Sequence, residues 1–83
     1  MVRILYFAGL REALQCSGES VSLPGEVRTV GELRHWLAAR EARWAPLGTM
    51  KNLRIAVNQA MVEPQSPVVA GDEVAFFPPV TGG

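Results

Sequence analysis

The residues best suited to chemistry stand at the end of the chain, which closes with Pro78-Pro79-Val80-Thr81-Gly82-Gly83. No charged side chain follows Glu73, so the α-carboxylate of Gly83 is the distinctive reactive group of this segment. Two prolines favour an extended path, and glycine has no Cβ, so this end could pass through a channel that a larger residue would block. We expect residues 78–83 to form a flexible tail that carries its carboxylate to a partner; the alternative is an inert, frayed end.

Three other reactive side chains stand alone in the sequence. Cys16 is the single cysteine, Lys51 the single lysine and His35 the single histidine. None has the companions that a nucleophilic centre or a metal site requires. We therefore expect Cys16 to serve as a small hydrophobic residue, and His35 and Lys51 to lie on the surface without a catalytic role. No metal site is predicted.

The rest of the chain must position the tail, and 83 residues allow one small domain with a thin core. Thr29 and Glu32 form a capping-box pattern, which predicts that a helix starts there. Val30, Leu33 and Leu37, joined by Trp36, should face a sheet, and Pro46 and Gly48 should end the helical stretch after Arg40 to Trp44. A shorter helix is expected over residues 10–15, closed by Gly18. Alternating or apolar runs predict strands over residues 2–7, 19–23, 53–57, 60–62 and 73–77.

This order of elements predicts a domain of the α+β class over residues 1–77, with a mixed sheet and a helix packed across one face. Eight basic and eight acidic residues give zero net charge, which argues against nucleic acid and anionic membranes as partners. A hydrophobic content of 48% with only 19% charged residues favours a protein partner instead. A lone cysteine and the lack of any apolar run of about 18 residues fit a cytoplasmic protein.

The run from Gly71 to Gly83 closely resembles the C-terminus of the small subunits of molybdopterin synthase. Phe7-Ala8 followed by Arg11-Glu12, and the stretch Ala56-Val57-Asn58-Gln59, also resemble that family in the same order. Ala70 departs from the pattern, since many relatives carry Asp before the Gly-Asp turn. The resemblance implies the β-grasp, or ubiquitin-like, fold.

The same resemblance implies a sulfur-carrier chemistry. A ubiquitin-activating-like partner would use ATP to adenylate Gly83, and sulfur transfer would convert the acyl adenylate to a thiocarboxylate. Inside the large subunit of the synthase, Gly83, preceded by Gly82, would donate sulfur to cyclic pyranopterin monophosphate and so build the molybdopterin dithiolene. The chain would bind no cofactor itself, would be inactive alone, and would assemble with the large subunit into a heterotetramer.

Partner-binding residues are also implied by the resemblance. They are Phe7, Arg11, Met61, Phe77, Pro78, Pro79, Val80 and Thr81. Four of them have a second interpretation, because the apolar residues Phe7, Met61 and Phe77 on short strands belong to the core by default and an exposed arginine such as Arg11 often has no partner.

Two other functions share the β-grasp and a Gly-Gly end. One is a protein modifier or a sulfur carrier for thiamin or tRNA, against which the run from Phe76 to Thr81 argues. The other is a ubiquitin-like binding module with an inert tail.

Overall fold

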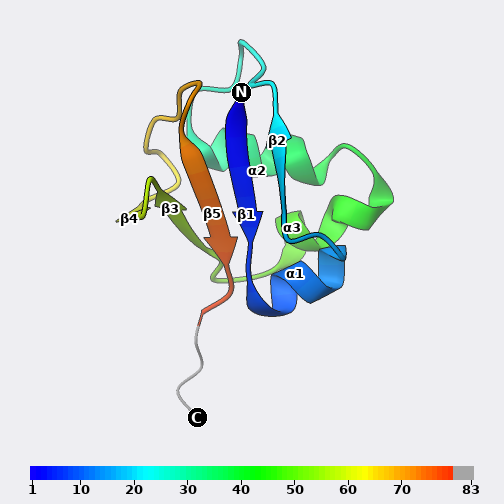
Figure 1. The fold of residues 1–83 in the computed structure, drawn as a ribbon. Helices are drawn as coiled ribbons and strands as arrows, with labels where there is room; N and C mark the ends of the chain where they lie inside the picture. The colour runs from blue at the N-terminus through cyan, green and yellow to red at the C-terminus, as the bar shows by residue number, and fades with distance from the viewer. Residues whose placement is uncertain (80–83) are drawn as a thin grey trace.

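Five strands form one mixed sheet in the computed structural model, which describes residues 1–79. The strand order is β2-β1-β5-β3-β4; β1 and β5 run parallel, and the other neighbours are antiparallel. The helical elements cover one face of this sheet (Figure 1). The strands are β1 (Val2–Tyr6), β2 (Gly18–Val21), β3 (Arg54–Val57), β4 (Ala60–Val62) and β5 (Glu73–Phe77), and the helices are α1 (Ala8–Leu14), α2 (Val30–Ala38), the 3₁₀ turn η1 (Ala42–Trp44) and α3 (Ala45–Thr49).

The core lies between the sheet and the helices. On β1 and β5 buried side chains alternate with more exposed ones, as expected for strands with one covered face. One cluster joins these inward residues to the helices, and the fold therefore has a single core. Its largest fully buried members include Ile4, Tyr6, Leu10, Leu14, Leu33, Leu37, Leu47, Val74 and Phe76.

The start of α2 confirms the capping-box prediction. The Glu32 backbone N–H donates to Thr29 Oγ1 at 3.1 Å, and the Thr29 N–H donates back to Glu32 Oε1 at 3.1 Å. Leu33 and Leu37 are fully buried against the sheet, whereas Trp36 is only half-buried at the side of the helix. The predicted apolar stripe is therefore correct, with Trp36 at its margin.

The prediction that one helical stretch runs on through Trp44 is wrong. The helix α2 ends at Ala38, and Glu41 is extended, with φ −155° and ψ 162°, before η1 and α3 begin. Pro46 lies in the first turn of α3, where a missing N–H costs nothing, so it begins a helix instead of ending one. Gly48 lies inside α3, where a Cβ would stand 3.0 Å from the Ala38 Cβ, so this glycine lets α3 approach α2 closely.

Gly18 also has a different role from the one expected. The helix α1 ends at Leu14, and its C-cap residue Gln15 adopts the left-handed conformation with φ 52°. Gly18 instead begins β2, where a Cβ would lie 2.8 Å from the Ile4 carbonyl oxygen. A larger residue would not fit at position 18, because the backbone of β1 lies directly against it.

Candidate functional site

The uncovered side of the sheet, called the open face below, carries three of the residues expected to meet a partner, Phe7, Met61 and Phe77. Because side chains alternate along a strand, the burial of Ile4 and Phe76 on the covered side directs Leu5, Ala75 and Phe77 outward. The strand register then fixes which outward residues are neighbours. The open face can therefore be described as rows of side chains that cross the strands.

The middle row crosses all five strands. Leu5 is in register with Gly18 on one side and Ala75 on the other, Ala75 with Ala56, and Ala56 with Met61. Met61 is 55% exposed, and Ala56 is buried but not part of the core cluster. The row is apolar throughout, with small side chains at its centre.

The next row lies toward the tail and is aromatic. Phe7 prolongs β1, and its N–H donates to the Phe76 carbonyl oxygen at 3.2 Å. Its ring meets that of Phe77 edge to face, with centroids 6.5 Å apart and an interplanar angle of 80°. Phe7 is 43% exposed and Phe77 is half-buried, so both rings remain available at the surface. On the other side of Phe77, the register places Arg54 of β3.

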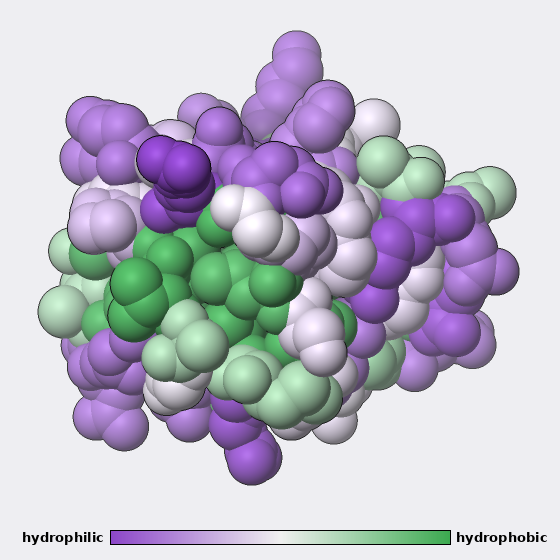
Figure 2. Space-filling view, turned by 90° about the horizontal axis from the view of Figure 1, so that it is seen from above, coloured by the Kyte–Doolittle hydropathy of each residue, from purple (hydrophilic) through white to green (hydrophobic). Residues whose placement is uncertain are grey.

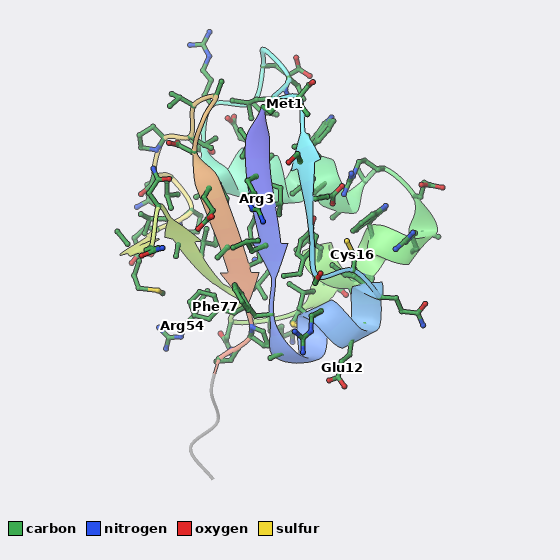
Figure 3. The ribbon with its side chains drawn as sticks, in the orientation of Figure 1. Met1, Arg3, Glu12, Cys16, Arg54 and Phe77 are labelled. Carbon is green, nitrogen blue, oxygen red and sulfur yellow. The ribbon has the colours of Figure 1, made fainter. Side chains whose placement is uncertain are left out.

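Figure 3 shows Phe77 and Arg54 together at the end of the sheet from which the chain continues toward its C-terminus. Pro78 and Pro79 follow β5 directly and are half-buried. Val80, Thr81, Gly82 and Gly83 lie outside the described residues. The aromatic row and Arg54 therefore border the point at which the last segment leaves the domain.

Arg11 belongs to the same end of the molecule. The helix α1 starts directly after Phe7, and the Arg11 N–H donates to the Phe7 carbonyl oxygen at 3.3 Å. The Arg11 side chain is exposed. The structure thus brings Phe7, Phe77 and Arg11 to one end of the molecule, and Met61 lies one row away from the two phenylalanines on the open face. Their role in partner binding stays a prediction.

A side-chain network holds the opposite end of β5. Asn58 Nδ2 donates to Asp72 Oδ1 at 3.0 Å, the Glu73 N–H donates to Asn58 Oδ1 at 3.0 Å, and the Val69 N–H donates to Asp72 Oδ2 at 2.9 Å. Asn58 and Gln59 both have positive φ, which is the two-residue hairpin turn expected from the sequence. The network locks the β3–β5 register and hence the position of Phe77.

A second network of side chains stabilises the edge of the sheet formed by β2. Arg40 donates to both carboxylate oxygens of Glu19 at 2.9 and 2.7 Å, the Tyr6 hydroxyl donates to Glu19 Oε2 at 2.6 Å, and the Arg40 guanidinium lies 4.1 Å from the centre of the Trp44 ring. The hydrogen bond from Arg40 lowers the pKa of Glu19, and burial raises the pKa of Tyr6. The same bond to Glu19 raises the pKa of Arg40. This network ties β2 to the turn after α2.

The isolated reactive residues lie where the sequence suggested. Cys16 is half-buried, packs against the core and donates its thiol to the Gly18 carbonyl oxygen at 3.3 Å. His35 and Lys51 are exposed. Among residues 1–79, no cluster of three or more His, Cys, Asp or Glu side chains could hold a metal ion. In the same part of the chain, no helix combines the length and apolar character needed to cross a membrane.

An open groove of about 680 Å³ runs beside the open face, at the β4 edge. Arg54 and Glu63 are its only charged lining residues, and no nucleophilic or acid–base constellation faces it. The groove can therefore offer apolar contacts and one charge of each sign to a partner.

The sequence did not identify four residues of this face: Leu5, Ala56, Ala75 and Arg54. Strand alternation indicated which positions face the same way, but it could not indicate which strands are neighbours. The parallel pairing of β1 with β5 and the antiparallel pairing of β5 with β3 bring these residues together from three distant segments.

Comparisons with known proteins find similar sequences over nearly the whole chain. A model of the ThiS family matches residues 4–83. The molybdopterin synthase sulfur carrier subunit of Escherichia coli (strain K12) is 43% identical over 83 residues, covering 100% of this chain and 100% of that relative.

Two solved structures extend this likeness. SAMP1 from Haloferax volcanii matches with a TM-score of 0.78 at 25% identity, covering 99% of this chain and 98% of that chain. A chain from the complex of subunits 1 and 2 of the molybdopterin-converting factor of Helicobacter pylori 26695 matches with a TM-score of 0.65 at 22% identity, covering 99% and 97%. The expected β-grasp fold is confirmed.

Proposed function

The chain belongs to the ThiS family, and from this premise we propose that it is the sulfur carrier of a molybdopterin synthase. The observation that carries the proposal is the full-length match to a curated sulfur carrier subunit at 43% identity. The geometry supports it, because β5 at the centre of the sheet leads directly into Pro78-Pro79 and the Gly82-Gly83 end. The domain acts as a rigid handle for a chain end that does the chemistry.

The reacting group in this proposal is the α-carboxylate of Gly83. A carboxylate resists nucleophilic attack until one oxygen becomes part of a good leaving group. An ATP-dependent activating partner would supply that step by forming the acyl adenylate, and sulfur would then replace AMP to give a thiocarboxylate. Gly82 and Gly83, having no side chains, would fit the narrow path to the pterin substrate, cyclic pyranopterin monophosphate.

In this proposal the catalytic residues for the transfer would belong to the large subunit. This chain would contribute the positioning of the reacting group at Gly83. Its open face, with Phe7, Met61 and Phe77, would dock on the partner, and Arg11 would contact the partner from α1. Pro78, Pro79, Val80 and Thr81 would lead the thiocarboxylate inward.

Intact-mass analysis tests the proposal directly. The chain is expressed in cells with and without the activating enzyme, and we expect an increase in mass equal to replacement of one oxygen by sulfur only in the first case. The thiocarboxylated protein is then mixed with the large subunit and cyclic pyranopterin monophosphate, and molybdopterin is assayed. An unmodified mass in both strains, or no product from the modified protein, would contradict the proposal.

The likeness to SAMP1, which stands for small archaeal modifier protein 1, favours one second function, the covalent modification of other proteins. In that case activated Gly83 would be attacked by lysine amines of other proteins. The same cells would then contain covalent conjugates of the chain that survive denaturing gel electrophoresis. Free thiocarboxylated chain without such conjugates would favour the sulfur carrier.

A further inference from the structure

The centre of the open face is low because its side chains are small. Ala56 and Ala75 are register partners on β3 and β5, and their side chains end at Cβ. Larger side chains surround this pair: Leu5 and Met61 in the same row, and Phe77 in the next. We call Ala56 and Ala75 the alanine pair. A flat partner surface would leave a gap above it, and gaps forfeit the contacts that stabilise an interface.

Arg54 adds a charge next to the alanine pair. It directly precedes Ile55 and Ala56 on β3, is exposed, and has Phe77 as its register partner. In residues 1–79 the only ion pair joins Arg40 to Glu19, and Arg54 donates no side-chain hydrogen bond there. Arg3, the other arginine on this face, is instead the register partner of Glu73 and lies in the row farthest from Phe77.

Covering Arg54 would be costly without an acidic partner group. A guanidinium that loses its water without gaining a carboxylate or carbonyl oxygen is strongly destabilised. The chain leaves the sheet at the end where Phe77 and Arg54 lie. We therefore expect a protein that receives the segment after Pro79 to cover this end of the sheet as well. The partner surface must therefore suit both the low apolar centre and the charge beside it.

We propose that the large subunit of the synthase inserts one bulky apolar side chain over the alanine pair and places a carboxylate against Arg54. This inference rests on the proposed function and specifies how that partner recognises this chain. The apolar contact supplies the buried centre of the interface, and the ion pair fixes the orientation in which β5 meets the partner.

The first test fills the low centre. Ala75→Leu adds bulk on the solvent side of β5, so we expect an unchanged melting temperature but a dissociation constant for the large subunit that rises by about tenfold or more. Val69→Leu is the matched control, because Val69 is 60% exposed at the opposite end of β5, and it should bind as the wild type does. Figure 2 looks down on that end, where exposed apolar residues also gather.

The second test reverses the charge. Arg54→Glu should weaken binding about tenfold or more at low salt, and the deficit should shrink in high salt as the repulsion is screened. Arg54→Lys should restore most of the affinity. Glu63→Gln is the control of opposite sign: Glu63 lines the same groove as Arg54, and loss of its negative charge should leave binding equal or tighter.

The outcomes separate the two proposals. Wild-type affinity in both Ala75→Leu and Arg54→Glu, with sulfur transfer intact in the wild type, would overturn this docking mode and leave the sulfur-carrier function standing. If Ala75→Leu lowers the melting temperature, the decision rests on Arg54→Glu, because the exposed Arg54 side chain can change without disturbing the core, and wild-type affinity there would overturn the docking mode. A wild-type chain that neither binds the large subunit nor yields product would overturn both.

Discussion

Phe76 and Phe77 are neighbours in the sequence but lie on opposite faces of the sheet, and replacing each by alanine should therefore have opposite consequences. Phe76 is fully buried, and its ring stacks on Tyr6 with centroids 6.2 Å apart. Phe77 is half-buried on the open face, in edge-to-face contact with Phe7. One position should govern the stability of the domain and the other its association.

The magnitudes follow from burial. Truncating a fully buried phenylalanine costs about 3 to 5 kcal/mol, and a domain of 83 residues has a total stability of about 4 to 12 kcal/mol. Phe76→Ala should therefore lower the melting temperature by at least about 12 °C, or prevent folding. Phe77→Ala loses one aromatic pair and part of one ring's burial, about 1 kcal/mol, which corresponds to about 4 to 8 °C.

Partner binding should rank the two changes the other way. If the Phe77 ring is an anchor in the interface, its loss costs about 1 to 4 kcal/mol of binding free energy, or about fivefold to about a thousandfold in the dissociation constant. Thermal unfolding followed by circular dichroism and calorimetric titration with the large subunit measure the two quantities on the same samples. A melting temperature as low for Phe77→Ala as for Phe76→Ala, together with wild-type affinity, would refute the assignment of Phe77 to the partner-binding face.

Three further predictions concern the chain end, acid stability and isolated activity. Deleting Gly83, or the change Gly83→Val, should leave folding and partner affinity nearly unchanged but abolish molybdopterin formation, because a misplacement of about 1 Å at a reacting atom can cost about a hundredfold; near-normal product from either variant would contradict the sulfur-carrier role. The lowered pKa of Glu19 predicts stability that is present above its ordinary pKa of 4.5 and is lost as the pH falls through the lower folded value. Urea unfolding between pH 6 and 3 should show this loss, which Glu19→Gln should reduce, and identical pH profiles would argue against the Arg40–Glu19 pair as its source. The thiocarboxylated chain without the large subunit should show no repeated turnover in the molybdopterin assay, and sustained product formation there would mean that the chain carries its own catalytic residues.

Local patterns were sufficient to predict most elements of the fold. The Thr29–Glu32 capping box, the Asn58-Gln59 turn and the alternation along β1 each depend on residues close in sequence, so the sequence contains the whole interaction. The end of α2 depends instead on a distant residue. Just after that end, Arg40 turns back to Glu19, 21 positions earlier, and pairs with both of its carboxylate oxygens. Helical spacing could not indicate this contact.

The open face shows the same division between local and distant information. Phe7, Met61 and Phe77 could be selected because they resemble residues of a known family, whereas Arg54 and the alanine pair became visible only with the register. The register of β5 is set from both sides, by β1 and β3, and by the Asn58–Asp72 hydrogen bond at its start. Such information is not encoded in any one segment.

In the proposed function, this register would also let so small a domain position its chain end. A slip of one residue along β5 would turn Phe77 toward the core and move the start of the last segment by about 3.3 Å. That displacement exceeds the roughly 1 Å that already impairs an oriented reaction. Because Phe77 and Pro78 are adjacent, the proposed docking contact and the origin of the segment that carries Gly83 are set by the same strand. Docking the open face on a partner therefore also fixes where the chain end begins, and the six residues beyond Phe77 need only span the remaining path.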